Sequence, residues 1–170
     1  HDFKPLPPKS EKPAETQIQA LLSRPKAEPW VKIRDEMQAT MMADCGVYRT
    51  GESLTRAAAT LKDLKHRYAN LGIQDRGSVF NTNLLEVLEL GNLLEIAEAT
   101  VASALARTES RGAHSREDFP GRDDERFFRH SLAYKDGEDA ARVEYKDVDI
   151  IYVEKDGQQV PKYPLEVRKY

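Results

Sequence analysis

Residues 84–105 read LLEVLELGNLLEIAEATVASAL, and this run decides the fold. Its apolar residues occur nearly all round a helix rather than on one stripe, which predicts a buried central helix. Glutamates interrupt the run about once per turn, so a packed bundle explains it better than a membrane span. Asn83, followed three residues later by Glu86, predicts a capping box at the start of this helix.

Two amphipathic stretches precede the long helix. Pro29 suits the first position of a helix, and apolar residues follow it at spacings of three and four, which predicts a helix over residues 29–44. Thr50 is a suitable N-cap for a second helix, in which apolar residues recur at the same spacings as far as Leu71. Together the three helices predict a mainly α fold, a spectrin-repeat-like antiparallel three-helix bundle over residues 29–111.

The first 28 residues contain five prolines among charged and small polar residues, a composition that favours extended chain. We therefore interpret residues 1–28 as a proline-rich linker from an upstream domain. A brief helix over residues 15–23 is the one ordered element that we expect in this stretch.

Short segments punctuated by glycine and proline follow the bundle, so residues 112–170 are expected to form a polar loop, a small β-hairpin and an extended C-terminal arm. The predicted β segments are residues 129–134, 141–148 and 149–153, with turns at Asp136-Gly137 and Asp156-Gly157. The arm is the final PLEVRKY, which has no periodicity.

Charge and cysteine content exclude several classes of protein. The 26 basic and 29 acidic residues give a net charge of −3 and are spread along the chain, which is unlike the basic stripe of a nucleic-acid binder. The single cysteine, Cys45, excludes an internal disulfide and a cysteine-ligated zinc or iron–sulfur site, and it indicates a reducing compartment. A buried, inert thiol is the favoured interpretation of Cys45.

The densest polar cluster is ESRGAHSREDFPGRDD, residues 109–124. One hypothesis is that Arg111 and Arg116 grip carboxylates or a phosphate while His114 exchanges a proton. The alternative is that Gly112 ends the long helix in a left-handed C-cap and the charges tie the loop to helix ends or to an adjoining domain. We favour the alternative, because so many alternating charges within sixteen residues suggest a network of fixed geometry.

No metal or cofactor site is predicted in this chain. His114 and His130 lack the close histidine spacing that is typical of metal sites. The nine glycines are scattered singly, whereas a dinucleotide-binding turn needs several of them between a strand and a helix. We therefore expect no catalytic, flavin-binding or metal-binding residue here.

The 109–124 run, followed by FFRHSLAY at 127–134, resembles the flavoprotein subunits of succinate dehydrogenase and fumarate reductase. In that family a Ser-Arg-Gly-Ala-His-x-Arg-x-Asp motif precedes Arg-Asp-Asp and a His-Ser/Thr-Leu segment. The stretch MQATMMADCGVYRTGESL is similar to the family's first helix and turn, and FNTNLLEVLELGNLLEIAEATVASALAR to its long helix. The ending PLEVRKY is similar to the family's Pro-x-x-x-Arg-x-Tyr terminus.

The resemblance implies the carboxy-terminal helical domain of an FAD-dependent enzyme that oxidises succinate to fumarate or catalyses the reverse. The FAD-binding and capping domains of that subunit would lie upstream, so FAD belongs to the full-length protein and this chain alone is predicted inactive. Implied partners are those two domains, an iron–sulfur subunit and, indirectly, membrane-anchor subunits, with no nucleic acid. The implied location is peripheral, on the cytoplasmic or mitochondrial matrix side of the inner membrane.

The resemblance also gives the polar cluster a role, which is to anchor this domain to the flavin domain. The candidate anchoring residues are Arg111, His114, Arg116, Asp118 and Asp123. Two alternatives stay open from sequence: a free-standing helical protein-interaction module, and the tail of an L-aspartate oxidase.

Overall fold

The computed structural model describes residues 4–25, 28–77, 79–137, 141–164 and 166. The helices are α1 Lys12–Ser23, α2 Trp30–Asp44, α3 Gly51–Ala69, α4 Thr82–Ala106 and α5 Asp124–Phe127. The strands are β1 Tyr48–Arg49, β2 Ser115–Arg116, β3 Arg129–Lys135, β4 Ala141–Asp147, β5 Tyr152–Lys155 and β6 Gln158–Pro161. The fold is mainly α, as the sequence predicts.

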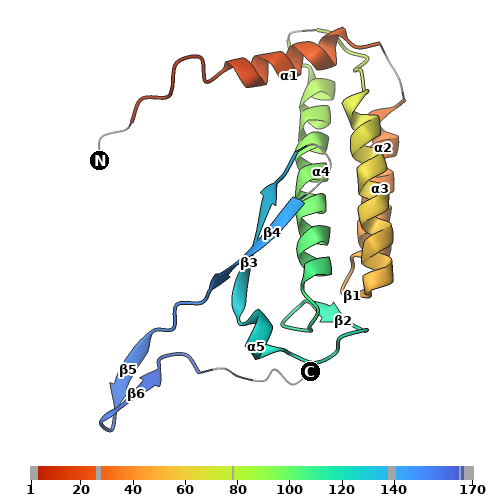
Figure 1. The fold of residues 1–170 in the computed structure, drawn as a ribbon. Helices are drawn as coiled ribbons and strands as arrows, with labels where there is room; N and C mark the ends of the chain where they lie inside the picture. Colours follow the sequence, from red (N-terminus) through yellow and green to blue (C-terminus); the bar gives the residue numbers. More distant parts are fainter. Residues whose placement is uncertain (1–3, 26–27, 78, 138–140, 165, 167–170) are drawn as a thin grey trace.

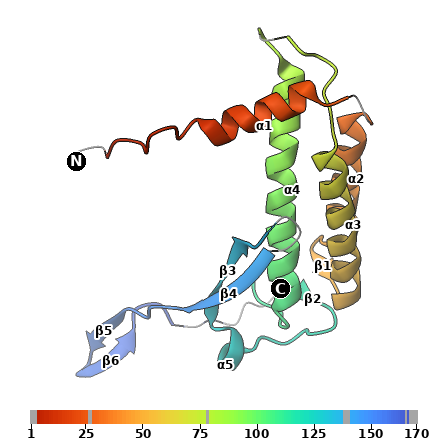
Figure 2. The same cartoon turned by 45° about the horizontal axis from the view of Figure 1, so that its top comes forward.

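Helices α2, α3 and α4 form the predicted antiparallel bundle. Figure 1 shows them side by side, each running opposite to the next. The hairpin of β3 and β4 packs along α4 on the side away from α2 and α3, and α1 crosses the bundle near the start of α4 (Figures 1 and 2). The polar loop after α4 therefore lies at the opposite end of the bundle from α1.

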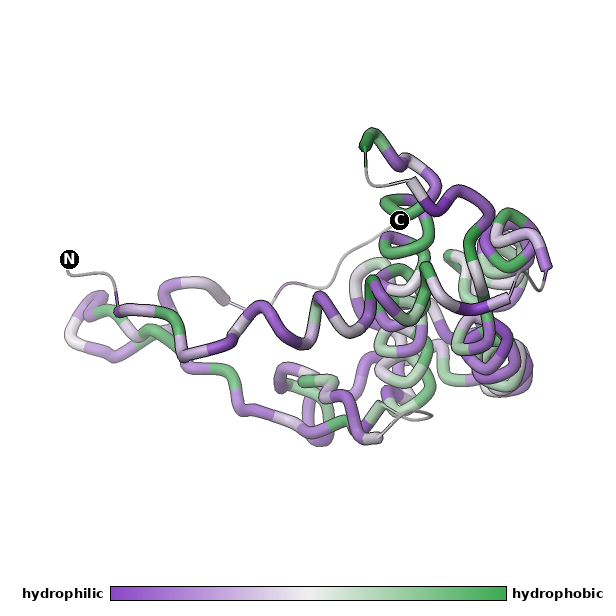
Figure 3. The backbone as a smooth tube through the Cα atoms, turned by 90° about the horizontal axis from the view of Figure 1, so that it is seen from above, coloured by the Kyte–Doolittle hydropathy of each residue, from purple (hydrophilic) through white to green (hydrophobic). Residues whose placement is uncertain are grey.

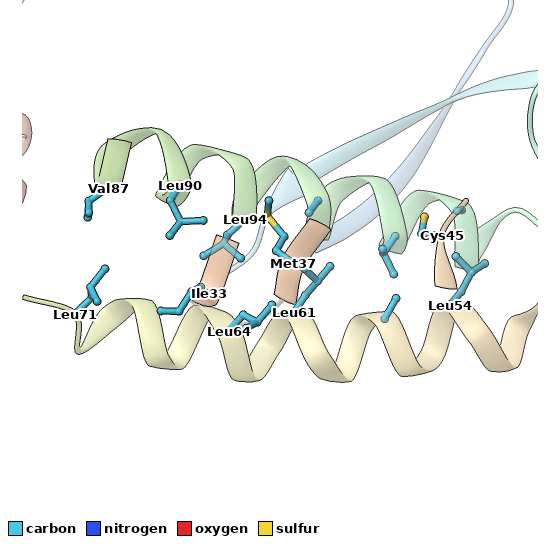
Figure 4. Close-up of a cluster of buried hydrophobic side chains, with 14 of the residues drawn as sticks. Ile33, Met37, Cys45, Leu54, Leu61, Leu64, Leu71, Val87, Leu90 and Leu94 are labelled. Atoms are coloured by element: carbon cyan, nitrogen blue, oxygen red, sulfur yellow. The ribbon is translucent and has the colours of Figure 1, made fainter. Parts of the chain in front are cut away.

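The core lies between the three long helices. The buried residues of α4 alternate at spacings of three and four, and Figure 4 shows several of them facing leucines of α3. These residues of α4 are Val87, Leu90, Leu94, Ala97, Val101 and Ala104. Helix α4 packs against α2, α3 and the hairpin of β3 and β4, which agrees with the predicted central helix, although Leu85 and Ile96 on another face are 60% and 63% exposed.

The sequence predicts the N-cap of α3 correctly and the N-cap of α4 incorrectly. Thr50 is the N-cap of α3, where its hydroxyl accepts from the Ser53 amide and the Ser53 hydroxyl accepts from the Thr50 amide. The cap predicted at Asn83 is wrong, since Asn81 is the N-cap of α4 and accepts from the Leu84 amide at 2.8 Å. Asn81 prevails because its side-chain amide also donates to two carbonyls of the preceding loop, at 2.9 Å each.

Helix α1 lies inside the stretch interpreted as a linker, and it starts three residues before the predicted helix. Its Leu21 is 2% exposed and joins the core. The chain that follows α1 packs closely against Gly72. A Cβ on Gly72 would lie 2.6 Å from the Arg24 carbonyl oxygen and 2.3 Å from that of Pro25, so a glycine is needed at this contact. The assignment of residues 1–28 as an interdomain linker stays a prediction.

The β segments largely follow the sequence. β3 and β4 confirm the predicted hairpin, and residues 138–140 of its connection lie outside the described residues. β5 begins at Tyr152, later than predicted, and pairs with β6 across the predicted turn, where Asp156 and Gly157 both have positive φ. The parallel pair of β1 and β2 was not predicted, because it joins segments far apart in sequence.

Hydrophobic residues gather mainly in the bundle, whereas the segments that extend away from it are mostly hydrophilic (Figure 3). Most of the predicted C-terminal arm, residues 165 and 167–170, lies outside the described residues. Within the arm, the carbonyl of Glu166 accepts a hydrogen bond of 3.0 Å from Arg122.

Candidate functional site

Glu109 is the centre of the polar loop, which we define as residues 107–124. Its side chain is 0% exposed. Its carboxylate accepts hydrogen bonds from Arg107 Nη1 at 2.6 Å, from Arg111 Nε at 2.8 Å and from the Asp123 amide at 2.8 Å. Burial alone would raise the pKa of Glu109, but the hydrogen bonds from Arg111, the Asp123 amide and Arg107 outweigh it and hold that pKa below its ordinary value. Glu109 is therefore an anion that ties the two ends of the loop together.

Arg116 closes the carboxy-terminal end of α4. Its side chain is 2% exposed, and its Nη1 donates to the carbonyls of Ala104 at 3.0 Å, Leu105 at 3.3 Å and Arg107 at 3.4 Å. The last carbonyls of a helix have no partner within it and carry partial negative charge. A guanidinium in this position therefore satisfies them both as hydrogen-bond donor and as cation.

Asp118 connects Arg116 to α3. Its two oxygens accept from Arg116 Nε and Nη2, each at 2.8 Å, and Oδ2 also accepts from the Gly51 amide at 2.8 Å. Hydrogen bonding by the Arg116 guanidinium holds the pKa of Asp118 well below its usual range. Because Gly51 is the first residue of α3, this ion pair links the end of α4 to the start of α3.

His114 uses both ring nitrogens. Its Nε2 lies 3.0 Å from the Arg107 carbonyl, which can only accept, so these partners assign the proton to Nε2. Its Nδ1 lies 3.5 Å from Arg49 Nη1, which can only donate. Burial, together with the charges of Arg49 and Arg116, lowers the pKa of His114 despite the hydrogen bond to Arg107. The imidazole is therefore neutral at neutral pH and oriented by two partners.

Asp123 and Asp124 hold the far end of the loop. Asp123 is the N-cap of α5, accepting from the Arg126 amide at 2.9 Å and from Arg126 Nε at 2.6 Å, and these bonds lower its pKa. Asp124 pairs with Arg111 at 2.6 Å and with Arg122 at 2.8 Å. The loop is thus a continuous network from α4 to α5.

The network borders a cationic groove of about 660 Å³, which lies between α4, β3 and the polar loop. Its charged or titratable lining residues are Arg49, Arg107, Arg111, His114, Arg129 and His130. Its remaining wall comes from small residues and Ile96 of α4 and from Ser131 and Ala133 of β3.

The structure divides the five predicted site residues into two groups. Arg111 and His114 line the cationic groove. Arg116, Asp118 and Asp123 make their contacts at the ends of helices α4, α3 and α5. All five belong to one connected region, and their role in anchoring another domain stays a prediction.

Sequence reasoning did not select Glu109, Arg107 or Arg49 as site residues. Glu109 belongs to the polar cluster of residues 109–124, and only its burial distinguishes it from the other acidic residues there. Arg49 has no local signal, because β1 pairing with β2 brings it to His114 across 65 residues of sequence.

The predicted C-cap at Gly112 is wrong. Helix α4 ends at Ala106, before the polar loop begins, and Arg116 supplies the cap from a distance. Gly112 instead has φ of +59° in a tight turn, which Arg111 and His114 close by two mutual backbone hydrogen bonds of 2.8 and 3.0 Å.

The described residues were also compared with the requirements of a metal site, a reactive thiol and a membrane-spanning helix. No group of three or more His, Cys, Asp or Glu side chains there is arranged to hold a metal ion. Cys45 is 7% exposed, and burial raises the pKa of its thiol, which agrees with the interpretation as a buried residue. None of the described helices has the length and apolarity needed to cross a membrane.

Fold and site together define a helical bundle domain whose polar end is closed by an internal arginine–carboxylate network. The family model described as "Fumarate reductase flavoprotein C-term" matches residues 34–170. The chain therefore belongs to the family of carboxy-terminal domains of the fumarate reductase and succinate dehydrogenase flavoprotein subunits, as its motifs predict.

Individual relatives agree with this assignment. The fumarate reductase flavoprotein subunit of Escherichia coli is 44% identical over 138 residues, covering 80% of this chain and 23% of that protein. The succinate dehydrogenase flavoprotein subunit of Rickettsia conorii is 39% identical over 130 residues, covering 76% of this chain and 22% of that protein. A solved E. coli quinol fumarate reductase chain superposes with a TM-score of 0.81 at 40% identity, covering 89% of this chain and 27% of that chain. This chain thus spans about a quarter of its relatives' length, and the alternative functions are not favoured.

Proposed function

We propose that this chain is the carboxy-terminal part of an FAD-dependent subunit that interconverts succinate and fumarate, and that it has a structural and docking role without chemistry of its own. One observation carries this proposal. The side chains that first suggested an active site, Arg111, His114 and Arg116, all have partners inside the domain. Side chains that the domain itself holds in this way fit a structural role better than substrate binding or proton exchange.

The described residues do not fit a flavin. Gly51 is the glycine that follows a strand and opens a helix, but its amide already donates to Asp118 at 2.8 Å. A pyrophosphate would need that helix N-terminus. We therefore assign FAD, and the redox chemistry that it supplies, to an upstream domain.

In this proposal the five anchoring candidates have two different roles. Arg116, Asp118 and Asp123 fix the shape of the polar loop through the helix ends that they hold. Arg111 and His114 line the groove beside it, where an upstream domain has access. An iron–sulfur subunit and membrane-anchor subunits would complete the enzyme, which would lie peripherally at the cytoplasmic or matrix face of the membrane.

The proposal is tested in the full-length subunit. Wild-type protein is expected to retain FAD and to oxidise succinate with an artificial electron acceptor, whereas a flavin-free protein without succinate-dependent turnover would overturn the enzyme assignment. Replacing Arg111 and His114 by alanine is expected to reduce assembly, FAD retention or turnover. The control is Arg142→Ala, at a half-exposed position on β4. Unchanged assembly, FAD content and turnover in the Arg111 and His114 variants would overturn the anchoring role.

A further inference from the structure

The cationic groove has more positive charge than the domain neutralises. Of its four arginines, Arg107 and Arg111 pair with the buried Glu109, and Arg111 also pairs with Asp124. In the part of the chain that the structure describes, no carboxylate pairs with either of the other two arginines, Arg49 and Arg129. The groove therefore presents two uncompensated guanidinium groups.

Arg49 is held in place. Its Nε donates to the Gly46 carbonyl at 2.9 Å, its Nη1 lies against His114, and its backbone carbonyl accepts from the Glu117 amide at 2.9 Å. A fixed guanidinium loses little side-chain entropy when an anion binds, and its planar fork suits a carboxylate. His114 therefore acts as an orienting neighbour of Arg49.

Arg129 lies on the opposite wall of the groove. Its guanidinium carbon lies 5.9 Å from the centroid of the Tyr145 ring, and its backbone carbonyl accepts from Arg107 Nη2 at 2.7 Å. At this distance the ring attracts the guanidinium weakly and does not neutralise its charge. Arg49 is therefore preorganised, Arg129 lies against an aromatic ring, and neither pairs with a carboxylate of the described residues.

The groove also has an apolar part. Ile96 is 63% exposed and lies in its wall beside the small residues Ala99 and Thr100. A small inorganic anion would leave this surface uncovered, whereas a polypeptide could place an acidic side chain on the arginines and an apolar one on Ile96. The composition of the groove thus favours a peptide segment.

We propose that the cationic groove binds an acidic segment of the same polypeptide, upstream of residue 1, with an Asp or Glu carboxylate between Arg49 and Arg129. The inference rests on the proposed function, because the relatives contain more than three times as much chain as is present here. Charge complementarity selects the occupant, since covering two cations in a partly apolar groove without a counter-charge would cost more than covering them with a carboxylate.

The test uses the full-length subunit in its complex. Arg49→Lys and Arg129→Lys each keep the positive charge and add an amine that a carbodiimide can couple directly to a contacting carboxylate, as mass spectrometry of the digest would show. Each introduced amine is expected to form an amide with an Asp or Glu upstream of residue 1. The matched control is Arg34→Lys, because Arg34 pairs with Asp35 at 2.8 Å and its introduced amine should couple only within residues 1–170.

Each outcome decides the inference. If the amine introduced by Arg49→Lys or Arg129→Lys couples only within residues 1–170, or only to another subunit, the proposed occupant is overturned. A reactive Arg34→Lys control with no coupling at either groove position would show that no carboxylate is bound there. Flavin content and succinate-dependent turnover of the wild type are measured in parallel, so an active wild type without groove coupling would overturn this inference and leave the proposed function standing.

A second measurement avoids substitutions altogether. Phenylglyoxal modifies accessible guanidinium groups, and in the wild-type complex Arg49 and Arg129 are expected to react at least roughly tenfold more slowly than the more exposed Arg142, because their guanidinium groups would be covered and hydrogen-bonded. Equal reaction rates would contradict a filled groove.

Discussion

At the scale of single residues, Glu109 shows how a buried charge can be stable in this domain. A carboxylate without partners would cost several kcal/mol in the protein interior. Glu109 has two arginines and a backbone amide as partners, and those arginines in turn bind other carbonyls and carboxylates. The polar loop can therefore fold around an anion instead of an apolar side chain.

Replacing Glu109 by glutamine should lower the free energy of unfolding by about 3 kcal/mol at pH 7, because it leaves the partly buried guanidinium groups of Arg107 and Arg111 without their shared counter-charge. The native pKa of Glu109 is lowered, so the folded state binds fewer protons than the unfolded state. The stabilisation is therefore present above the unfolded pKa of about 4.3 and is lost as the pH falls through the native value. Urea unfolding at a series of pH values would measure this.

The control for this experiment is Glu117→Gln, because Glu117 is an exposed neighbour in the same loop. It should change the free energy of unfolding by less than about 0.5 kcal/mol. A difference between wild type and Glu109→Gln that stays constant down to pH 3 would contradict the assigned role of the buried carboxylate.

His114 should make stability depend on pH in a higher range. Its native pKa is lowered, so protonation disfavours the folded state, and stability should fall as the pH decreases from about 6.5 toward the native value. His114→Gln should abolish this decline, which urea midpoints between pH 7.5 and 5 would show. The exposed His66 provides the control variant, His66→Gln, which should keep the wild-type slope. An unchanged slope in His114→Gln would assign the decline to another group.

At the scale of helices and strands, the ends of the elements are held by side chains that come from elsewhere. Arg116 binds the carbonyls at the end of α4, and the Tyr145 hydroxyl on β4 donates to the Ala106 carbonyl at 3.2 Å. Asp118 binds the first amide of α3. Each of these contacts joins two elements, so the polar end of the bundle forms as a unit.

Two neighbouring asparagines test where α4 begins. Asn81→Ala should lower the free energy of unfolding by about 2 kcal/mol, because it removes the N-cap and two further hydrogen bonds to loop carbonyls. Asn83→Ala should be nearly neutral, since the buried Oδ1 of Asn83 has no hydrogen-bond partner among the described residues. Thermal or urea unfolding of the pair would compare them, and a larger loss at Asn83 would restore the cap that the sequence suggested.

At the scale of the whole molecule, a different segment packs against each end of the bundle. Helix α1 lies over the end where α4 begins, and the polar loop closes the other end (Figure 1). The attachment of α1 depends on Leu21 and on the close contact of Gly72 with Arg24 and Pro25, the two residues that follow α1. The orientation of the chain upstream of α1 therefore depends on the contact at Gly72.

Gly72→Ala should detach α1, because its Cβ would overlap the carbonyls of Arg24 and Pro25. Limited digestion with thermolysin, whose preferred sites in α1 include Ile18, Leu21 and Leu22, should then cleave α1 roughly tenfold faster than in wild type, as expected for an opening made about 1.4 kcal/mol easier. Gly121→Ala is the control, since its Cβ would meet no atom of a described residue within 4 Å. Equal cleavage rates in wild type and Gly72→Ala would show that α1 is held by other contacts.

Much of this architecture follows from local patterns. The bundle helices, the hairpin of β3 and β4, the N-cap at Thr50 and the turn at Asp156-Gly157 were predictable, because periodicity, capping and turn preferences act over a few residues. The cap of α4 was misplaced, since two asparagines lie two residues apart and only the preceding loop selects Asn81. Likewise, Gly112 was predictable as a position of positive φ but not as a turn separate from the helix.

The sequence by itself determined the fold class, the family and most of the residues of the polar network, because these depend on residue types and their spacing. Only the tertiary structure decided what the network does. Burial made Glu109 its centre, the end of α4 recruited Arg116, and the pairing of β1 with β2 placed Arg49 beside His114. These contacts depend on the solvation and distances of groups that are far apart in the chain, and no local pattern encodes them.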